Sequence, residues 1–193
     1  MKKLCYGHTN TFYIAGTNGG LLIDTDYAGT LPNFFKAVKT ACIKLNDITY
    51  ALATHYHPDH IGIISELQKL GIVLLIVDVQ ENSIHFADEI FYKDKRLNYI
   101  PIDETKAKVI CCAESRDFLC GIGIGGEVIH TPSHSEDSVS IILDDGNCIV
   151  GDLEPIEYLE AYNNNLKLKC DWEKVMSYHP KQVLYAHANE KYL

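Results

Sequence analysis

The residues best suited to chemistry lie in one run of the chain, Thr54-His55-Tyr56-His57-Pro58-Asp59-His60. Imidazoles and carboxylates are groups that proteins use to bind divalent transition metals. In extended backbone, side chains two residues apart face the same way, so His55 and His57 can bind one ion. Pro58 suits the first turn of a helix, which would direct Asp59 and His60 elsewhere. The run therefore predicts ligands for two adjacent metal ions.

Three further candidate ligands stand near the ends of predicted strands. His134 lies in the turn Thr131-Pro132-Ser133-His134-Ser135, Asp152 ends a strand over 149–152, and His187 ends a segment over 183–187. Side chains at strand ends project from a rigid sheet into a common cleft, which favours a preorganised site. Taken singly, each of these residues is more often a hydrogen-bonded turn residue.

The elements that must position these side chains follow from hydrophobic spacing and turn signals. We predict strands over 11–15, 21–24, 48–53, 72–77, 127–130, 138–143, 148–150 and 183–186, of which the first two form an antiparallel hairpin. We predict helices over 31–45, 61–70, 80–91, 155–162 and 171–178. Residues 92–108 show no clear period and are expected to form a surface loop.

Composition bounds the class of protein. The chain has 193 residues, of which 47% are hydrophobic, so we expect one domain over 1–193 with one continuous core. The formal net charge is −9 and no run of Lys or Arg interrupts it, which disfavours binding to nucleic acid or to anionic lipid. We therefore expect a small-molecule substrate and neither a nucleic-acid nor a membrane partner. The oligomeric state is left open.

The segments also indicate the compartment. The longest apolar run, 72–77, falls far short of the roughly 20 residues that a membrane span requires. Polar residues interrupt the start of the chain where an export signal needs apolar ones. Seven cysteines at irregular spacing, without a Cys-x-x-Cys pair, favour reduced thiols. We expect a cytoplasmic protein.

Taken together, these segments resemble the metallo-β-lactamase superfamily. Five pieces occur in the order of that family: Asp24 after an early strand, the run 54–60, the segment 131–134, Gly151-Asp152, and the late Ala186-His187. The resemblance spans nearly the whole chain. It implies an α/β (α+β) fold in which two mixed β-sheets form a four-layer αββα sandwich with helices on the outer faces.

The resemblance also implies how the ligands are shared. It places His55, His57 and His134 on one metal, Asp59, His60 and His187 on the other, and Asp152 as the bridge between them. Asp24 would support the site from behind the ligands. Asp59 and Asp152 are the expected catalytic residues. Four other histidines match no ligand position in the pattern and are excluded: His8, His85, His130 and His179.

The implied activity is metal-dependent hydrolysis. Two divalent metal ions, with Zn expected and Fe or Mn also suited to these ligands, would share a bridging hydroxide that hydrolyses an ester, thioester, lactone or phosphodiester. Asp at the bridging position, together with His60, is similar to the glyoxalase II and lactonase branches, whereas many true β-lactamases carry Cys there. Because the chain ends shortly after His187, we expect it to lack the helical substrate domain of glyoxalase II type enzymes.

Two alternatives remain open, as does the substrate. One is an oxidoreductase similar to the persulfide dioxygenases, which would use a single iron on the three-histidine half. The other is a non-catalytic metal-binding protein. The substrate-binding residues are not fixed by the sequence. Residues 92–96, Tyr158 and Tyr162 are candidates that would suit organic, anionic substrates, although ordinary surface or packing roles are favoured for each. Whether 92–108 forms a lid is open.

Overall fold

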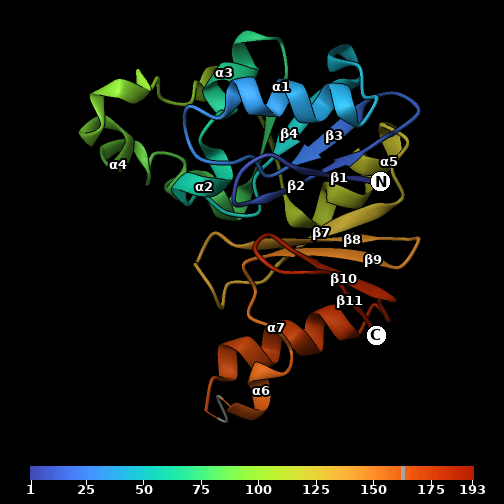
Figure 1. The fold of residues 1–193 in the computed structure, drawn as a ribbon. Coiled ribbons are helices and arrows are strands. Elements are labelled where there is room, and N and C mark those ends of the chain that lie inside the picture. The colour runs from blue at the N-terminus through green and yellow to red at the C-terminus, as the bar shows by residue number, and fades with distance from the viewer. Residues whose placement is uncertain (162–163) are drawn as a thin grey trace.

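Two β-sheets lie face to face between outer layers of helices (Figure 1). The structure is a computed structural model that describes residues 1–161 and 164–193. Within these residues one sheet has six strands in the order β1-β2-β3-β4-β5-β6, and the other has five in the order β11-β10-β9-β8-β7. The predicted four-layer αββα arrangement with two mixed sheets is confirmed.

The first sheet positions residues 54–60, the ligand run. Its strands are β1 (Lys2–Cys5), β2 (Asn10–Ile14), β3 (Gly20–Ile23), β4 (Ile48–Leu52), β5 (Val73–Val77) and β6 (Lys108–Ile110). The predicted hairpin is confirmed, because β2 and β3 pair antiparallel with Phe12 opposite Ile23. Strands β3, β4, β5 and β6 run parallel, so their carboxyl ends share one edge. The run 54–60 follows β4 at that edge.

The second sheet supplies the ends from which the remaining candidate ligands emerge. Its strands are β7 (Gly126–His130), β8 (Val139–Leu143), β9 (Asn147–Gly151), β10 (Gln182–Tyr185) and β11 (Lys191–Tyr192). Strands β9 and β10 pair parallel, whereas the other neighbours pair antiparallel. Asp152 follows β9 and Ala186-His187 follows β10, so the two parallel strands end at the same edge.

Helices cover the outer faces of both sheets (Figure 1). The helices are α1 (Leu31–Thr40), α2 (Pro58–Ile61), α3 (Ile64–Lys69), α4 (Asp88–Lys93), α5 (Ser115–Gly121), α6 (Tyr158–Ala161) and α7 (Leu166–Met176). Short 3-10 helices span Leu45–Asp47, Asp78–Ser83, Lys95–Leu97, Glu104–Lys106 and Cys112–Glu114. Helices α1 and α3 lie over the first sheet, and α7 lies over the second. None of the described helices combines the length and the apolar character that crossing a bilayer demands.

Three layers of apolar side chains hold the sandwich together. Successive residues of a strand point to opposite faces, so Leu22 packs under α1 while Leu21 packs between the sheets. On the far side, Trp172 of α7 packs on the outer face of the second sheet, where it is 1% exposed. Both sheets are therefore covered on both faces, which explains why the central strands are continuous apolar runs.

The predicted helix over 31–45 is too long, and the predicted helix over 80–91 is wrong. Helix α1 ends at Thr40 because Cys42 adopts a left-handed conformation, φ 53°. In place of 80–91, a 3-10 helix over Asp78–Ser83 precedes the short α4. Gln80 explains the difference, since its side chain is fully buried and bonds to the end of β4 rather than facing solvent.

Other corrections concern elements with weak local signals. The loop predicted over 92–108 contains α4 residues and two 3-10 helices and leads into β6, and α5 was not predicted. Helix α7 begins at Leu166 rather than at 171, because the Asn165 side chain caps it by accepting the Leu168 N–H. The helix predicted over 155–162 is reduced to α6, and its last residue, Tyr162, lies outside the described residues.

Gly62 packs closely against the backbone of the loop after β3, which cannot move away. It follows α2, and a methyl group on it would lie 2.2 Å from the backbone nitrogen of Ala28 and 2.4 Å from the carbonyl oxygen of Asp26. These are backbone atoms of the loop after β3, so neither can swing away. The close approach sets the distance between the ligand run and the Asp24–Asp26 segment.

Gly62→Ala should therefore lower the free energy of unfolding by about 3 kcal/mol, because the added methyl group forces backbone apart. Gly121→Ala is the matched control: a methyl group at this last residue of α5 would meet nothing within 4 Å. Urea unfolding of the two variants measures the difference. Equal midpoints for both variants would contradict the close approach.

Candidate metal centre

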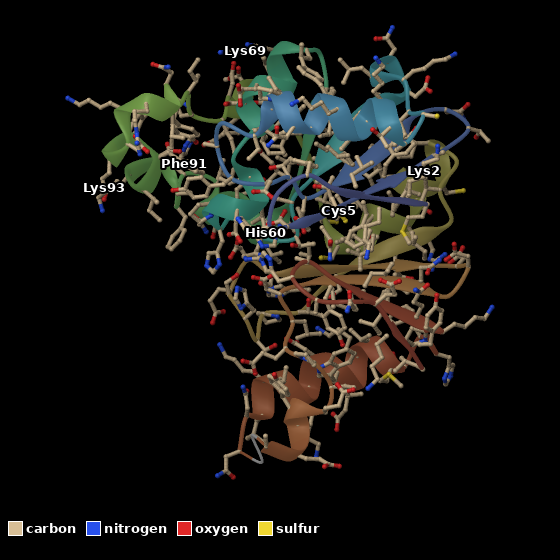
Figure 2. All side chains as sticks on the ribbon, viewed as in Figure 1. Lys2, Cys5, His60, Lys69, Phe91 and Lys93 are labelled. Atoms are coloured by element: carbon tan, nitrogen blue, oxygen red, sulfur yellow. The ribbon has the colours of Figure 1, made fainter. Side chains whose placement is uncertain are left out.

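Seven predicted ligands come together at the edge where the two sheets meet. His55 and His57 lie in the turn after β4, and Asp59 and His60 lie in α2. The second sheet contributes three ligands from its loops: His134 between β7 and β8, Asp152 after β9, and His187 after β10. Figure 2 shows His60 at the boundary between the two sheets, below the helices of the first.

The first group of possible ligands consists of His55, His57, His134 and Asp152, whose donor atoms all lie within 4.8 Å of one another. His134 Nε2 is 3.2 Å from His57 Nδ1. The Asp152 Oδ2 atom is 3.8 Å from His55 Nε2 and 3.5 Å from His134 Nε2. These four side chains surround a space that could hold one ion.

The second group consists of Asp59, His60 and His187, whose donor atoms also lie within 4.8 Å of one another. His187 Nε2 is 3.1 Å from Asp59 Oδ2, and His60 Nε2 is 3.9 Å from the same oxygen. The two halves of the sandwich thus meet in this group, because Asp59 and His60 come from the first sheet and His187 from the second.

Asp152 lies between the groups with one oxygen toward each. Its Oδ2 atom faces the first group, whereas its Oδ1 atom is 3.4 Å from His60 Nε2 and 3.3 Å from His187 Nε2. A carboxylate in this position can bind two ions at once. The arrangement matches the bridging role that the resemblance implied.

Three of the candidate ligand atoms are buried without a hydrogen-bond partner, which a bound metal ion would supply. His55 Nε2, His60 Nε2 and Asp152 Oδ1 are buried but have no hydrogen bond of acceptable geometry. Buried polar atoms without a partner are costly and rare in folded proteins. Imidazole and carboxylate donors suit Zn, Fe and Mn. The residues present therefore fit two divalent cations.

Asp24 orients His60 from behind. Its carboxylate is 1% exposed, and Oδ2 is 3.1 Å from His60 Nδ1, which leaves Nε2 to face the second group. The same carboxylate accepts hydrogen bonds from the Thr54 N–H at 2.6 Å and from the Thr54 hydroxyl. Such partners fix the ring orientation of a ligating histidine and raise its basicity. The Asp24 side chain therefore contacts His60 on the side of the ring opposite Nε2.

The backbone of His8 orients His187, although the His8 side chain is no ligand. His187 Nδ1 is 3.0 Å from the His8 carbonyl oxygen, so Nε2 is the atom left for a metal. Asp26 holds this loop, because its Oδ2 accepts from the N–H groups of His8 at 2.5 Å and Thr9 at 3.0 Å. A backbone acceptor leaves no trace in residue types, which is why the sequence did not reveal it.

Gln80 and Asp137 fix the turn after β4. The Gln80 amide nitrogen donates to the carbonyl oxygens of Ala53 at 2.9 Å and Asp137 at 3.2 Å. The Asp137 carboxylate accepts from the Tyr56 N–H at 2.7 Å, between the two ligands of the turn. Both side chains are buried. Neither carries a local sequence signal, because each acts only through segments that are distant in the chain.

Helix α7 holds the two loops of the second sheet. Asp171, 3% exposed, accepts from the Ser133 N–H at 2.7 Å, next to His134. Trp172 Nε1 donates to the Glu154 carbonyl oxygen at 2.8 Å, two residues after Asp152. Neighbouring residues of one helix therefore anchor the loops that carry two ligands.

Burial keeps the imidazoles of His55 and His134 neutral before an ion binds. Burial, reinforced by the neighbouring imidazoles, lowers the pKa of His55 far below its ordinary value. Burial also lowers the pKa of His134. Neutral imidazoles are the form that binds a metal, so these two ligands need to lose no proton at neutral pH.

The second group behaves differently. Burial lowers the pKa of His60, but the carboxylates of Asp24 and Asp152 outweigh burial and raise that pKa to about 10. A hydrogen bond with Asp59 raises the pKa of His187 to about 8. The same contact lowers the pKa of Asp59 to about 2. Two imidazolium groups at neutral pH must therefore lose protons when an ion enters this group.

Among the described residues, three cavities that adjoin the ligands can be named. One of about 310 Å³ is lined by Asp152, His187 and neighbouring residues. A second of about 170 Å³ lies beside His134, and a third of about 210 Å³ lies beside His57 and Phe86. A larger hollow of about 480 Å³ lies between β1 and α1 and includes none of the ligands. Each of the three smaller cavities is thus lined by at least one of the candidate ligands.

The predicted rim residues do not line these three cavities. Residues 92–96 fall in α4 and the following 3-10 helix, and Arg96 pairs with Asp94 at 2.7 Å. Tyr158 lies on α6 and is 46% exposed. Tyr162 lies outside the described residues. The walls come instead from the loop after Asp152 and from the 3-10 segment that carries Ser83 and leads to Phe86.

Comparison with known proteins yields consistent matches. A family model described as the metallo-β-lactamase superfamily matches residues 6–190. The beta-lactamase-like protein 2 homolog of Drosophila melanogaster is 24% identical over 187 residues. That match covers 94% of this chain but 59% of the relative, so the chain spans less than two thirds of the length of the relative.

Solved structures share the fold at low identity. A protein solved in a di-iron-bound form is 19% identical and gives a TM-score of 0.71, with 100% of this chain and 94% of that chain covered. A class B3 di-zinc metallo-β-lactamase from an Alaskan soil metagenome is 15% identical and gives a TM-score of 0.64, with 97% and 79% covered. These likenesses show the fold.

Asp171→Ala should weaken zinc binding about tenfold, because the loop that carries His134 loses its anchor at the Ser133 N–H. Asp171→Asn keeps a side-chain oxygen that can accept this hydrogen bond and should stay within about threefold of the unchanged protein. Competition with a fluorescent zinc chelator measures the affinities. Unchanged affinity in a folded Asp171→Ala protein would show that α7 does not support the site.

Zinc affinity should rise with pH between pH 6 and 8. The raised pKa values of His60, about 10, and His187, about 8, mean that protons compete with the ion across this range. At pH 7, filling the second group should release about two protons. Isothermal titration calorimetry in buffers of different ionisation enthalpy counts them. An affinity independent of pH over this range would contradict the assigned protonation states.

Proposed function

The chain belongs to the metallo-β-lactamase superfamily, and on that basis we propose that it is a metal-dependent hydrolase of small-molecule esters, thioesters, lactones or phosphodiesters. The superfamily consists mostly of hydrolases. The observation that carries the proposal is the position of Asp152, with one carboxylate oxygen toward each of two ligand groups. A centre for a single ion would need only one of these groups.

The proposed cofactors are two divalent ions. His55, His57 and His134 would hold the first, Asp59, His60 and His187 the second, and Asp152 both. We favour Zn, which the di-zinc structure of similar fold supports. Fe is the second choice, which the di-iron-bound structure supports. When bound, such ions supply a hydroxide nucleophile at neutral pH and polarise a carbonyl or phosphoryl oxygen.

The residues of the chain supply orientation and charge. Because the pKa of Asp59 is held at about 2, its side chain is a carboxylate at neutral pH and can accept a hydrogen bond from water at the centre. Asp152 adds a second negative charge between the groups. Asp24 and the His8 carbonyl fix the imidazoles of His60 and His187, so the ligands do not need to reorganise during the reaction.

The geometry favours hydrolysis over the two alternatives. A single-iron oxidoreductase similar to the persulfide dioxygenases would use the three-histidine half, whereas here the second group is also complete. A non-catalytic metal protein would need no opening to the ligands, whereas a cavity of about 310 Å³ is lined by Asp152 and His187. That volume suits a small molecule.

Compartment and partners are part of the proposal. All seven cysteines are free of disulfides, which supports a reducing, cytoplasmic compartment. The net charge of −9 supports a small-molecule substrate rather than nucleic acid or an anionic membrane.

Asp152→Ala should lower the metal content below two ions per chain and reduce hydrolysis at least about hundredfold, because both groups lose a shared ligand. His134→Ala should deplete the first group alone. Metal analysis and a panel of ester, thioester, lactone and phosphodiester substrates measure both effects, with circular dichroism to confirm folding.

Asp117→Ala is the matched control, since Asp117 is exposed on α5 and away from the ligands. It should retain both ions and full activity. Full activity in folded Asp152→Ala would overturn the two-metal proposal.

A further inference from the structure

The walls around the candidate centre are acidic and apolar. The cavity of about 310 Å³ has Glu154 in its wall beside the apolar residues Leu153, Pro155 and Tyr185. The cavity next to His134 again includes Glu154. The third contains Glu136 and Asp137 in its wall. Among the described residues that line these three cavities there is no Lys or Arg.

Glu154 is placed to meet a substrate. It is half-buried, it lines two of the three cavities, and it follows Asp152 by two residues. In the part of the chain that the structure describes, no lysine or arginine forms an ion pair with it. Its backbone cannot drift, because its carbonyl oxygen accepts the hydrogen bond from Trp172 Nε1. The backbone of Glu154 is therefore held near the ligands, and its carboxylate has no lysine or arginine partner among the described residues.

Lysines around the centre are paired with carboxylates, and one of these carboxylates, Glu136, lines the third cavity. Lys167 lies 2.5 Å from the carboxylate of Glu136. Lys191 pairs with Glu157. Figure 2 shows Lys69 and Lys93 at the outer surface of the helical layer, away from His60. Among the described residues that line these cavities, an anionic group on a substrate would thus find no free ammonium or guanidinium group.

We infer that this site selects substrates whose distal group is uncharged or cationic, and that Glu154 is the residue that enforces the selection. The inference rests on the proposed function. The metal ligands would receive the reacting ester or thioester, whereas the remainder of the molecule would lie against Glu154, Leu153 and Tyr185. A carboxylate or phosphate there would meet a like charge, and an ammonium group would meet an opposite one. Organic anions, which the candidate rim residues named from the sequence would have suited, are therefore not the substrates that we infer.

Three acetyl thioesters with distal groups of different charge test the inference with the zinc-loaded protein. Acetylthiocholine carries an ammonium group, 3,3-dimethylbutyl thioacetate is its neutral isostere, and S-acetyl-3-mercaptopropionate carries a carboxylate. Each consumes one water, breaks its C–S bond, and releases acetate and a thiol. We expect kcat/KM for the cationic ester to exceed that for the anionic ester about tenfold.

Glu154→Lys should reverse this order, and Glu154→Gln should remove the advantage of the cationic ester over its neutral isostere. Glu160→Lys is the matched control: it makes the same charge change on exposed α6, away from the three cavities, and should keep the original order. Zinc content should be the same in all four proteins, because Glu154 is not a ligand. An unchanged order in Glu154→Lys would overturn the role of Glu154.

Binding separates this inference from the proposed function. The methyl thioethers of the same three distal groups cannot be hydrolysed, and their binding can be followed through the fluorescence of Trp172, the single tryptophan of the chain. If no thioester is hydrolysed but the ammonium thioether binds most tightly, the hydrolase proposal weakens while the charge selection stands. If the thioesters are hydrolysed but the carboxylate thioether binds most tightly, or all three bind equally, the charge selection is wrong.

Discussion

The buried carboxylate of Asp24 is the constraint on which the geometry of the centre depends. A carboxylate removed from water costs several kcal/mol unless it is fully hydrogen-bonded. Asp24 meets this demand through Thr54 and His60, which belong to the end of β4 and to α2. It does so from a left-handed backbone conformation, φ 58°, that non-glycine residues rarely adopt. The contacts of Asp24 therefore fix the end of β3, the turn after β4 and helix α2 relative to one another.

Thr54 extends this constraint to the second sheet. Its carbonyl oxygen accepts from the Val139 N–H at 2.8 Å at the start of β8. A methyl group on Gly151, at the end of β9, would lie 2.5 Å from its hydroxyl oxygen, so only glycine lets the backbone approach so closely. Gly151 directly precedes Asp152. The Asp152 carboxylate is thus positioned by contact with the same residue that Asp24 binds, and one threonine couples both halves of the candidate centre.

The sequence predicted the residues that gather at the candidate centre because they follow local rules of type and spacing. The run 54–60 has four donor residues at fixed spacing after an apolar strand, and the structure places all four at the centre. The contacts that support these residues were not predicted, because Gln80, Asp171 and the His8 carbonyl act across segments far apart in the chain. Glu154 could not be recognised either. An acidic residue gains meaning only when the charges of its neighbours are known in space.

The contact between His187 and the His8 carbonyl also bears on how the protein folds. It joins residues 179 positions apart, and the second group needs side chains from both sheets. Contacts between residues so far apart in sequence form slowly, because the entropy of closing the loop is lost before the contact can stabilise the chain. An ion held by the second group would therefore bind only to a chain whose two sheets have already docked, so metal uptake there would report completed folding rather than initiate it.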